Sequence, residues 1–218
     1  TTLASSGDGY KKIQNDINLP LLEKYTLLNK IRYRLDYIKY LSNIRDYDIV
    51  QICDPFFIPF PYFPYKNILS NLKKNNGKVF LYAAGSDSFY WTNGPKYLKY
   101  GPFEDTIKYD LGGIKPKQLK NNAIKFNKYI ADNVDGVIPN SYEYEISYSK
   151  HKNLREIILQ PIEINNLNQK SSNINKIIVL HGITRYGLKG TRHIEKAFNK
   201  IRKENKNAEF IIRKKQSL

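Results

Sequence analysis

The sequence predicts an α/β protein built on a parallel sheet, and two observations carry this prediction. Short apolar runs rich in β-branched residues end in turn formers, and they alternate with longer stretches in which apolar residues recur at helical spacing. Such alternation favours a parallel sheet with helical crossovers, whose strands are buried on both faces. The predicted strands are residues 48–53, 78–84, 135–140, 156–161, 176–182 and 208–212.

Three stretches between these strands have helical periodicity. Residues 21–45 and 116–132 are amphipathic, and residues 191–204 repeat the pattern with Ile194 and Phe198 on one face. We expect each of them to cover the sheet with its apolar side.

The chain divides at residues 163–175, where Asn, Gln and Ser replace the apolar periodicity and predict a linker. Residues 1–162 are then a first Rossmann-like domain that lacks its first strand. Residues 176–218 are the first strand, helix and second strand of another, truncated domain. The sequence begins Thr-Thr-Leu and contains no Met, so we expect a fragment that is incomplete at both ends.

The net charge of +16 is concentrated toward the C-terminus, where residues 151–218 hold 15 Lys and Arg against 5 Asp and Glu. Such a field attracts phosphates on a nucleotide, a nucleic acid or an anionic membrane. The alternative is a biased amino-acid usage without functional meaning. The single cysteine, Cys53, cannot form an internal disulfide, and its apolar run predicts a small buried side chain in a reducing compartment.

An aromatic and proline-rich run, residues 55–67, cannot form regular helix or central strand throughout. It fits a loop packed against the sheet. An apolar surface for a lipid-linked acceptor or a membrane interface is the alternative.

The stretch HGITRYGLKG, residues 181–190, joins a predicted strand to a predicted helix through a turn with three glycines. Ligands of open α/β sheets bind at such strand ends, and a helix N-terminus favours a phosphate. Arg185 offers a planar fork and Lys189 a compact charge, which together suit a diphosphate. A basic turn that is merely solvated is the alternative.

This stretch resembles the opening of the C-terminal domain in GT-B glycosyltransferases, particularly the retaining group called glycosyltransferase family 4. In that family a strand, a basic turn, a Lys-Gly pair and a helix form part of the donor site. The resemblance implies that Arg185 and Lys189, with Gly182 and Gly190, bind the diphosphate of a nucleotide sugar.

Three segments of the first half, residues 47–56, 83–91 and 135–148, resemble cleft-facing segments of the family's N-terminal domain, in the same order. Ala84 stands where many relatives carry a His, so the role of that His does not carry over. The resemblance implies an acceptor cleft formed by Gly85, Ser86, Asp87, Asn140 and Ser141.

Asp87 is the one weak candidate for a catalytic residue. It follows an apolar run and would recognise an acceptor hydroxyl or assist as a general base. A helix cap or turn residue is the equal alternative.

The resemblance implies an enzyme that moves a sugar from a nucleotide-diphosphate donor to a glycan or lipid-linked acceptor, in bacterial surface-polysaccharide biosynthesis. It implies no cofactor and no catalytic metal. The protein is expected in the cytoplasm, or alternatively in peripheral contact with the inner face of the membrane. The other hypothesis is a non-catalytic remnant or a basic phosphate- or nucleic-acid-binding module, although no nucleic-acid motif is present and no specific nucleic acid is expected.

Overall fold

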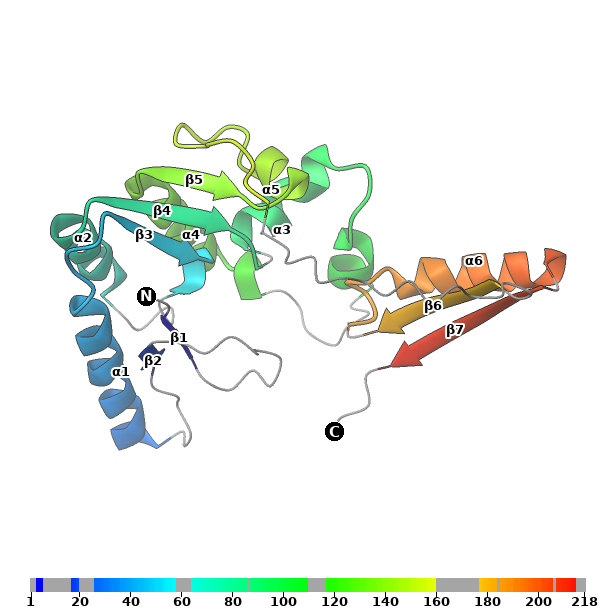
Figure 1. Ribbon diagram of the computed structural model, residues 1–218, viewed down its shortest axis with the longest axis horizontal. Coiled ribbons are helices and arrows are strands. Elements are labelled where there is room, and N and C mark those ends of the chain that lie inside the picture. The colour runs from blue at the N-terminus through cyan, green and yellow to red at the C-terminus, as the bar shows by residue number, and fades with distance from the viewer. Residues whose placement is uncertain are drawn as a thin grey trace, which may run out of the picture.

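The computed structural model describes residues 3–5, 17–19, 26–57, 64–85, 87–109, 117–159, 177–183, 185–205 and 207–214. These residues form an α/β protein in which every sheet is parallel (Figure 1). The predicted linker, residues 163–175, lies outside the described residues.

The main sheet has three strands in the order β3 (Ile49–Cys53), β4 (Lys78–Ala83) and β5 (Gly136–Pro139). The three predicted strands of this sheet, residues 48–53, 78–84 and 135–140, are confirmed to within one residue at either end. Two short strands, β1 (Leu3–Ser5) and β2 (Ile17–Leu19), form a separate parallel pair.

The core lies where the main sheet meets α1 (Leu27–Ser42), α2 (Tyr65–Asn75) and α4 (Asn121–Asn133). Side chains alternate across a strand, so β4 directs every second residue into this core. Those core residues are Val79, Leu81 and Ala83, all 0% exposed.

Two helices follow the carboxyl ends of two strands of this sheet: α3 (Ser88–Tyr97) follows β4, and α5 (Tyr142–Ser147) follows β5. Beyond α3 the chain forms a π-helical turn, η2 (Glu104–Lys108). The predicted helix 116–132 begins later than expected, because a 3-10 turn, η3 (Lys117–Leu119), precedes α4. The predicted helix 21–45 is α1, and its residues 21–25 lie outside the described part.

The proline-rich run is helical at both ends. A 3-10 turn, η1, spans Pro55–Phe57, and α2 begins directly after Pro64. Phe56, Phe57 and Tyr65 pack against the core, as a loop covering the sheet should. Residues 58–63 lie outside the described part of the chain.

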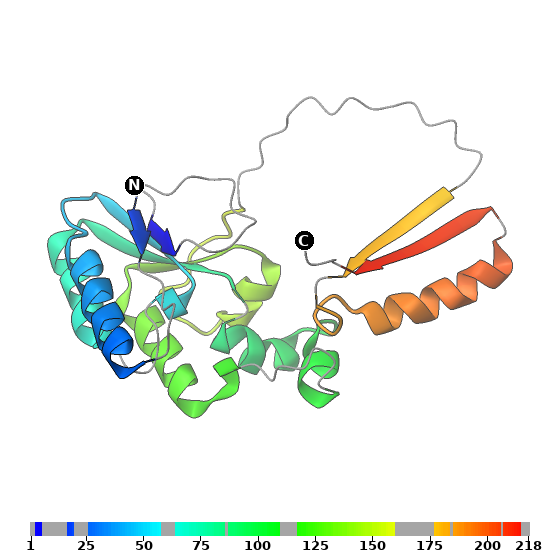
Figure 2. The same ribbon diagram turned by 90° about the horizontal axis from the view of Figure 1, so that it is seen from below.

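The C-terminal unit consists of β6 (Ile177–Ile183), α6 (Thr191–Glu204) and β7 (Ala208–Lys214), and it stands apart from the main sheet (Figures 1 and 2). Its helix has the predicted bounds. Because β6 and β7 pair in parallel, α6 is the crossover between them, and Phe198 packs on Phe210 with ring centroids 4.6 Å apart.

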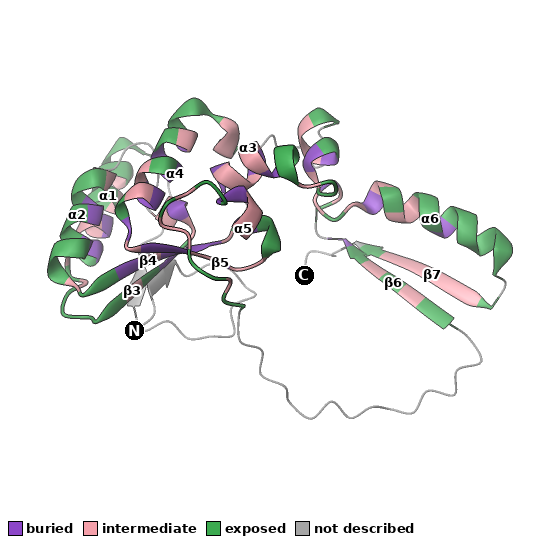
Figure 3. Ribbon diagram, turned by 90° about the horizontal axis from the view of Figure 1, so that it is seen from above, coloured by how far each residue is buried: buried purple, intermediate pink, exposed green. Residues whose placement is uncertain are grey.

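The prediction that the strands are buried on both faces is correct for β4 and β5 and wrong for β3 and β6. On β6, Ile178 and Leu180 are each 62% exposed, because α6 covers only one side of a two-stranded sheet. Much of β6 is accordingly coloured as exposed or intermediate in Figure 3. Cys53, predicted to be buried, is exposed. It lies on β3, an edge strand whose side chains alternate between core and surface.

The predicted strand 156–161 is also wrong. Its described residues, 156–159, have no strand, and the pairing stops at an isolated bridge between Leu154 and Val137. The backbone nevertheless follows β5, since Arg155 N donates to Val137 O and Ile158 N donates to Pro139 O. No helix in the described part of the chain is long and apolar enough to cross a membrane.

Candidate functional site

The turn after β6 is closed by its own backbone. Lys189 N donates to Arg185 O at 3.0 Å, and Thr191 N donates to Tyr186 O at 3.2 Å. Gly190 has a φ of +61°, a conformation that a side chain disfavours, and it is the N-cap of α6. The turn therefore places its residues directly at the positive end of the α6 dipole.

Two side-chain contacts fix this turn on the helix. His181 Nε2 lies 3.0 Å from the buried Thr191 Oγ1, and the Tyr186 hydroxyl donates to the Glu195 carboxylate. Arg185 and Lys189 are exposed and have no ion pair or side-chain hydrogen bond with the other described residues. The turn thus carries two cationic side chains that are not paired with any other described residue.

A charged cluster joins α6 to η2. Arg192 Nε lies 2.8 Å and its Nη2 2.6 Å from Asp105 Oδ1, while Asp105 is only 3% exposed. The Arg192 guanidinium also lies over the Tyr109 ring, with its Cζ 5.1 Å from the ring centroid. Glu104 Oε2 lies 3.7 Å from Arg192 Nη2. A desolvated, two-point contact of this kind fixes orientation as well as charge.

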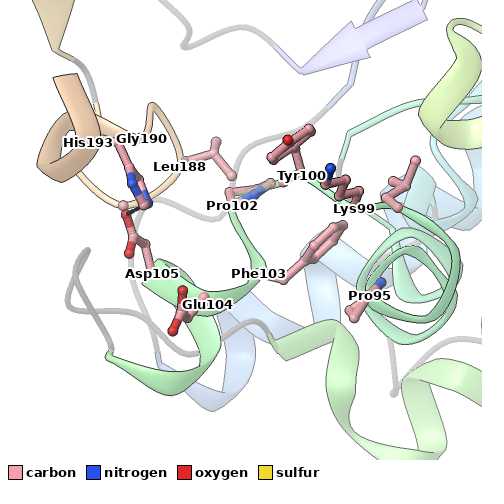
Figure 4. A pocket seen from close by; sticks show the side chains of 13 residues that line it. Pro95, Lys99, Tyr100, Pro102, Phe103, Glu104, Asp105, Leu188, Gly190 and His193 are labelled. Atoms are coloured by element: carbon pink, nitrogen blue, oxygen red, sulfur yellow. Dashed lines mark ion pairs between the residues drawn. The ribbon is translucent and has the colours of Figure 1, made fainter. Parts of the chain in front are cut away.

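A pocket of about 580 Å³ opens beside this cluster (Figure 4). One wall comes from Pro95 near the end of α3 and from the segment that follows, Leu98 to Asp105, and the other from the turn before α6 and from His193 in its first turn. Asp105 and His193 lie together, and Tyr100 and Phe103 lie across the pocket from them (Figure 4). Three residues of the predicted donor turn, Gly187, Leu188 and Gly190, therefore line this pocket.

Asp87 is a helix cap, as one of the two sequence interpretations predicted. Its Oδ1 accepts from Tyr90 N at 2.8 Å, and its Oδ2 accepts from the Tyr148 hydroxyl at 2.7 Å. The side chain is 0% exposed, and this burial raises its pKa to about 7 despite the hydrogen bonds that lower it. Asn127 donates to the same Tyr148 hydroxyl and extends the buried network.

Next to this network, Asp54 and Gly85 meet at the carboxyl ends of β3 and β4. Asp54 has a φ of +91°, which is strained for a residue with a side chain. Burial raises the pKa of its carboxyl to about 6. A Cβ on Gly85 would lie 2.6 Å from Asp54 Oδ2, so only glycine allows this approach.

The predicted site residues fall into two groups. Arg185, Lys189 and Gly190 share the turn, and Gly182 lies exposed within β6 before it. On the other side, Gly85, Asp87, Asn140 and Ser141 all follow the carboxyl ends of β4 and β5, where Asn140 N donates to Ala83 O. Ser141 is the N-cap of α5, without a side-chain capping bond. Ser86 lies outside the described residues.

Sequence reasoning missed Asp54, Tyr100, Asp105 and Arg192. The only local signal for Asp54 was an Asp before a proline at the end of a strand, which is typical of a turn. Asp105 and Arg192 are joined by tertiary contact alone.

In three comparisons with known proteins, the chain matches no protein-family model, no curated protein and no solved structure. Within the described residues, no group of three or more His, Cys, Asp or Glu side chains is placed to hold a metal ion.

Proposed function

We propose that this chain belongs to a glycosyltransferase that binds a nucleotide-diphosphate sugar at the β6–α6 turn and transfers the sugar to a glycan or lipid-linked acceptor. The observation that carries the proposal is the pair of exposed cations, Arg185 and Lys189, which lie just before the N-terminus of α6 and form no ion pair or side-chain hydrogen bond with any other described residue. Two nearby cations on a fixed turn suit the two phosphates of a diphosphate.

The electrostatics of the turn support the same ligand. The dipole of a 14-residue helix adds a positive partial charge at its N-terminus, next to the turn that carries both residues. In sugar transfer, negative charge grows on the departing diphosphate, and fixed cations at that position stabilise it. The resemblance of the turn to the donor site of family 4 supports a sugar nucleotide as the ligand.

The acceptor side of the proposal is supported by the position of Gly85 and Asn140. Both follow carboxyl ends of parallel strands, the edge at which α/β sheets bind ligands. Asp87 lies there too, but its full burial and its capping bond favour a structural role, so no protein base is assigned. In a retaining reaction the departing diphosphate can take the acceptor proton.

Isothermal titration of the full chain with pyrophosphate, UDP and UDP-glucose tests the donor site. We expect Arg185→Ala and Lys189→Ala each to weaken pyrophosphate binding about tenfold or more, the usual effect of a lost charged hydrogen bond. Lys200→Ala removes an exposed cation from the same helix, away from the turn, and should leave the affinity unchanged. Equal affinities in all four proteins would remove the donor assignment.

The phosphate- or nucleic-acid-binding alternative has one observation in its favour, the exposed cations Lys196, Lys200 and Lys203 along α6. Binding of duplex DNA through such a face would weaken steeply with salt. Strong, salt-sensitive DNA binding that Lys200→Ala reduces, without any nucleotide binding, would favour this alternative.

A further inference from the structure

The first half of α1 carries a stripe of exposed aliphatic side chains. Leu27, Ile31 and Leu35 recur every four residues, and Leu28 precedes Leu35 by two turns, so all four share one side of the helix. Leu27, Leu28 and Leu35 are 75%, 79% and 63% exposed, and Ile31 is 50% exposed. No other helix in the described part of the chain exposes more than one large aliphatic side chain.

The core anchors only the other half of this helix. The two buried residues of α1, Tyr37 and Leu41, lie in its second half and belong to the core of the main sheet. In Figure 1, α1 lies at the outer edge of the main sheet, at the opposite end of the molecule from α6. The first half of α1 is thus held by a folded support while its apolar stripe stays open to a partner.

Cations border the stripe on both sides. At about 100° per residue, Arg34 lies at one border of the stripe and Arg32 at the other. Residues 26–35 contain Lys30, Arg32 and Arg34 and no Asp or Glu. The single acid of α1, Asp36, lies 3.8 Å from Arg32 in an exposed ion pair, and such surface pairs are weak. A partner that is both anionic and apolar matches this surface.

The helix dipole favours the same kind of partner. A helix N-terminus is stabilised by negative charge, yet α1 has no acidic residue in its first turn and has Lys30 there instead. An anionic surface next to this half of the helix would supply the missing negative charge.

Two occupants of the stripe differ in how they meet its cations. A second copy of the chain in a two-fold dimer would bring the same patch opposite itself, so Arg32 and Arg34 would face like charges. An anionic bilayer offers phosphates in one plane and acyl chains directly beneath them, and the net charge of +16 attracts the chain to it. A basic helix with an apolar stripe is typical of helices that lie on membranes.

We propose that α1 is a peripheral membrane anchor that lies in the plane of an anionic phospholipid bilayer. The four aliphatic residues of the stripe enter the acyl boundary, and Arg32 and Arg34 contact lipid phosphates. The helix has 16 residues and rests on the bilayer without crossing it. The inference does not use the donor assignment, although a chain bound in this way would meet a lipid-linked acceptor at the same surface.

Flotation of the full chain with lipid vesicles tests the anchor. We expect vesicles of phosphatidylcholine and phosphatidylglycerol to bind the chain at least about tenfold more tightly than vesicles of phosphatidylcholine alone. Binding should weaken when NaCl is raised from about 0.1 M to about 0.5 M, because salt screens the charges. Equal binding to both kinds of vesicle, or binding to neither, would overturn the inference.

Leu35→Gln and Leu180→Gln are a matched pair of variants, because the two leucines are 63% and 62% exposed. Leu35→Gln should weaken binding to the anionic vesicles about five- to tenfold, whereas Leu180→Gln on β6 should leave it unchanged. Circular dichroism checks that both variants fold, and Leu28→Gln replaces Leu35→Gln if that variant does not. Equal losses in the α1 and β6 variants would contradict a role of the stripe.

Arg32→Gln and Lys200→Gln separate a local contact from the overall charge, since each removes one exposed cation. Arg32→Gln should weaken vesicle binding about three- to fivefold and Lys200→Gln should not. Equal losses would show that only the overall charge attracts the chain, which would overturn the inference. Self-association without vesicles that Leu28→Gln abolishes would assign the stripe to a second copy and overturn it as well.

Discussion

Arg192 of α6 lies 2.6 Å from Asp105 of η2, a residue 87 positions earlier in the chain. The acid is almost fully buried, whereas the arginine side chain keeps 27% of its surface exposed. Through this pair the C-terminal unit is held against the segment that follows α3. Asp105 also lines the pocket, together with His193, which follows Arg192 in α6.

Arg192→Ala should loosen the attachment of the C-terminal unit. The change leaves the buried Asp105 carboxylate without its hydrogen-bonded cation, which destabilises the attached state. Energy transfer between dyes on the exposed Cys53 and on a Lys200→Cys variant measures the separation of the two units. We expect weaker transfer in the Arg192→Ala protein.

The control for this measurement is Lys196→Ala, which removes an exposed cation of α6 that forms no ion pair or side-chain hydrogen bond with the described residues of η2. Its transfer efficiency should equal that of the parent protein. If Arg192→Ala also left the efficiency unchanged, the ion pair would not hold the two units together.

Replacing Gly85 and Gly182 by alanine, one at a time, distinguishes a glycine that the backbone conformation requires from one that it does not. Gly85→Ala should destabilise the protein by about 1–3 kcal/mol, because φ is +77° and the new Cβ would lie 2.6 Å from Asp54 Oδ2. Gly182→Ala meets nothing within 4 Å and should be neutral or roughly 0.5–1 kcal/mol more stable. Urea unfolding followed by circular dichroism measures both, and equal effects would contradict the assigned role of Gly85.

The stability that Asp87 and Asp54 contribute should fall as the pH rises from about 4 to about 7. Burial raises the pKa of Asp87 to about 7 and of Asp54 to about 6, against an ordinary value of 3.8. The folded state therefore binds more protons than the unfolded chain in this window, and its free energy of unfolding decreases with pH. Chemical denaturation at about pH 4.5 and about pH 7.5 measures the difference.

Asp87→Asn tests the source of this dependence. The amide oxygen preserves the cap on Tyr90 N without a titrating charge, so the drop in stability should become smaller. A pH dependence identical to that of the parent protein would show that Asp87 does not titrate in this range.

The sequence predicted the local elements well, because their signals are local. Helix 191–204 was predicted with its correct bounds from the spacing of residues such as Ile194 and Phe198. The same apolar spacing could not tell what covers a strand, and so β6 and Cys53 were expected to be buried. Burial depends on which elements pack against one another, and the spacing of apolar residues within one element does not show this.

The candidate site was predictable in part for the same reason. Arg185 and Lys189 lie four residues apart on one turn, so a sequence pattern can find them. Asp105 and Arg192 approach only when two separate segments meet, and no spacing rule connects residues so distant. The approach of Asp54 to Gly85, which follows the neighbouring strand β4, likewise depends on the pairing of two strands that are distant in sequence.

The most direct test of the donor assignment is a titration of the isotope-labelled full chain with UDP-glucose, followed through the backbone amide signals. We predict saturable shifts at the turn and first residues of α6, from Arg185 to Arg192, with small changes in α2 and in the last turn of α6. Arg185→Ala should abolish the shifts at the turn. Shifts confined to other elements, or none at saturating ligand, would contradict the account.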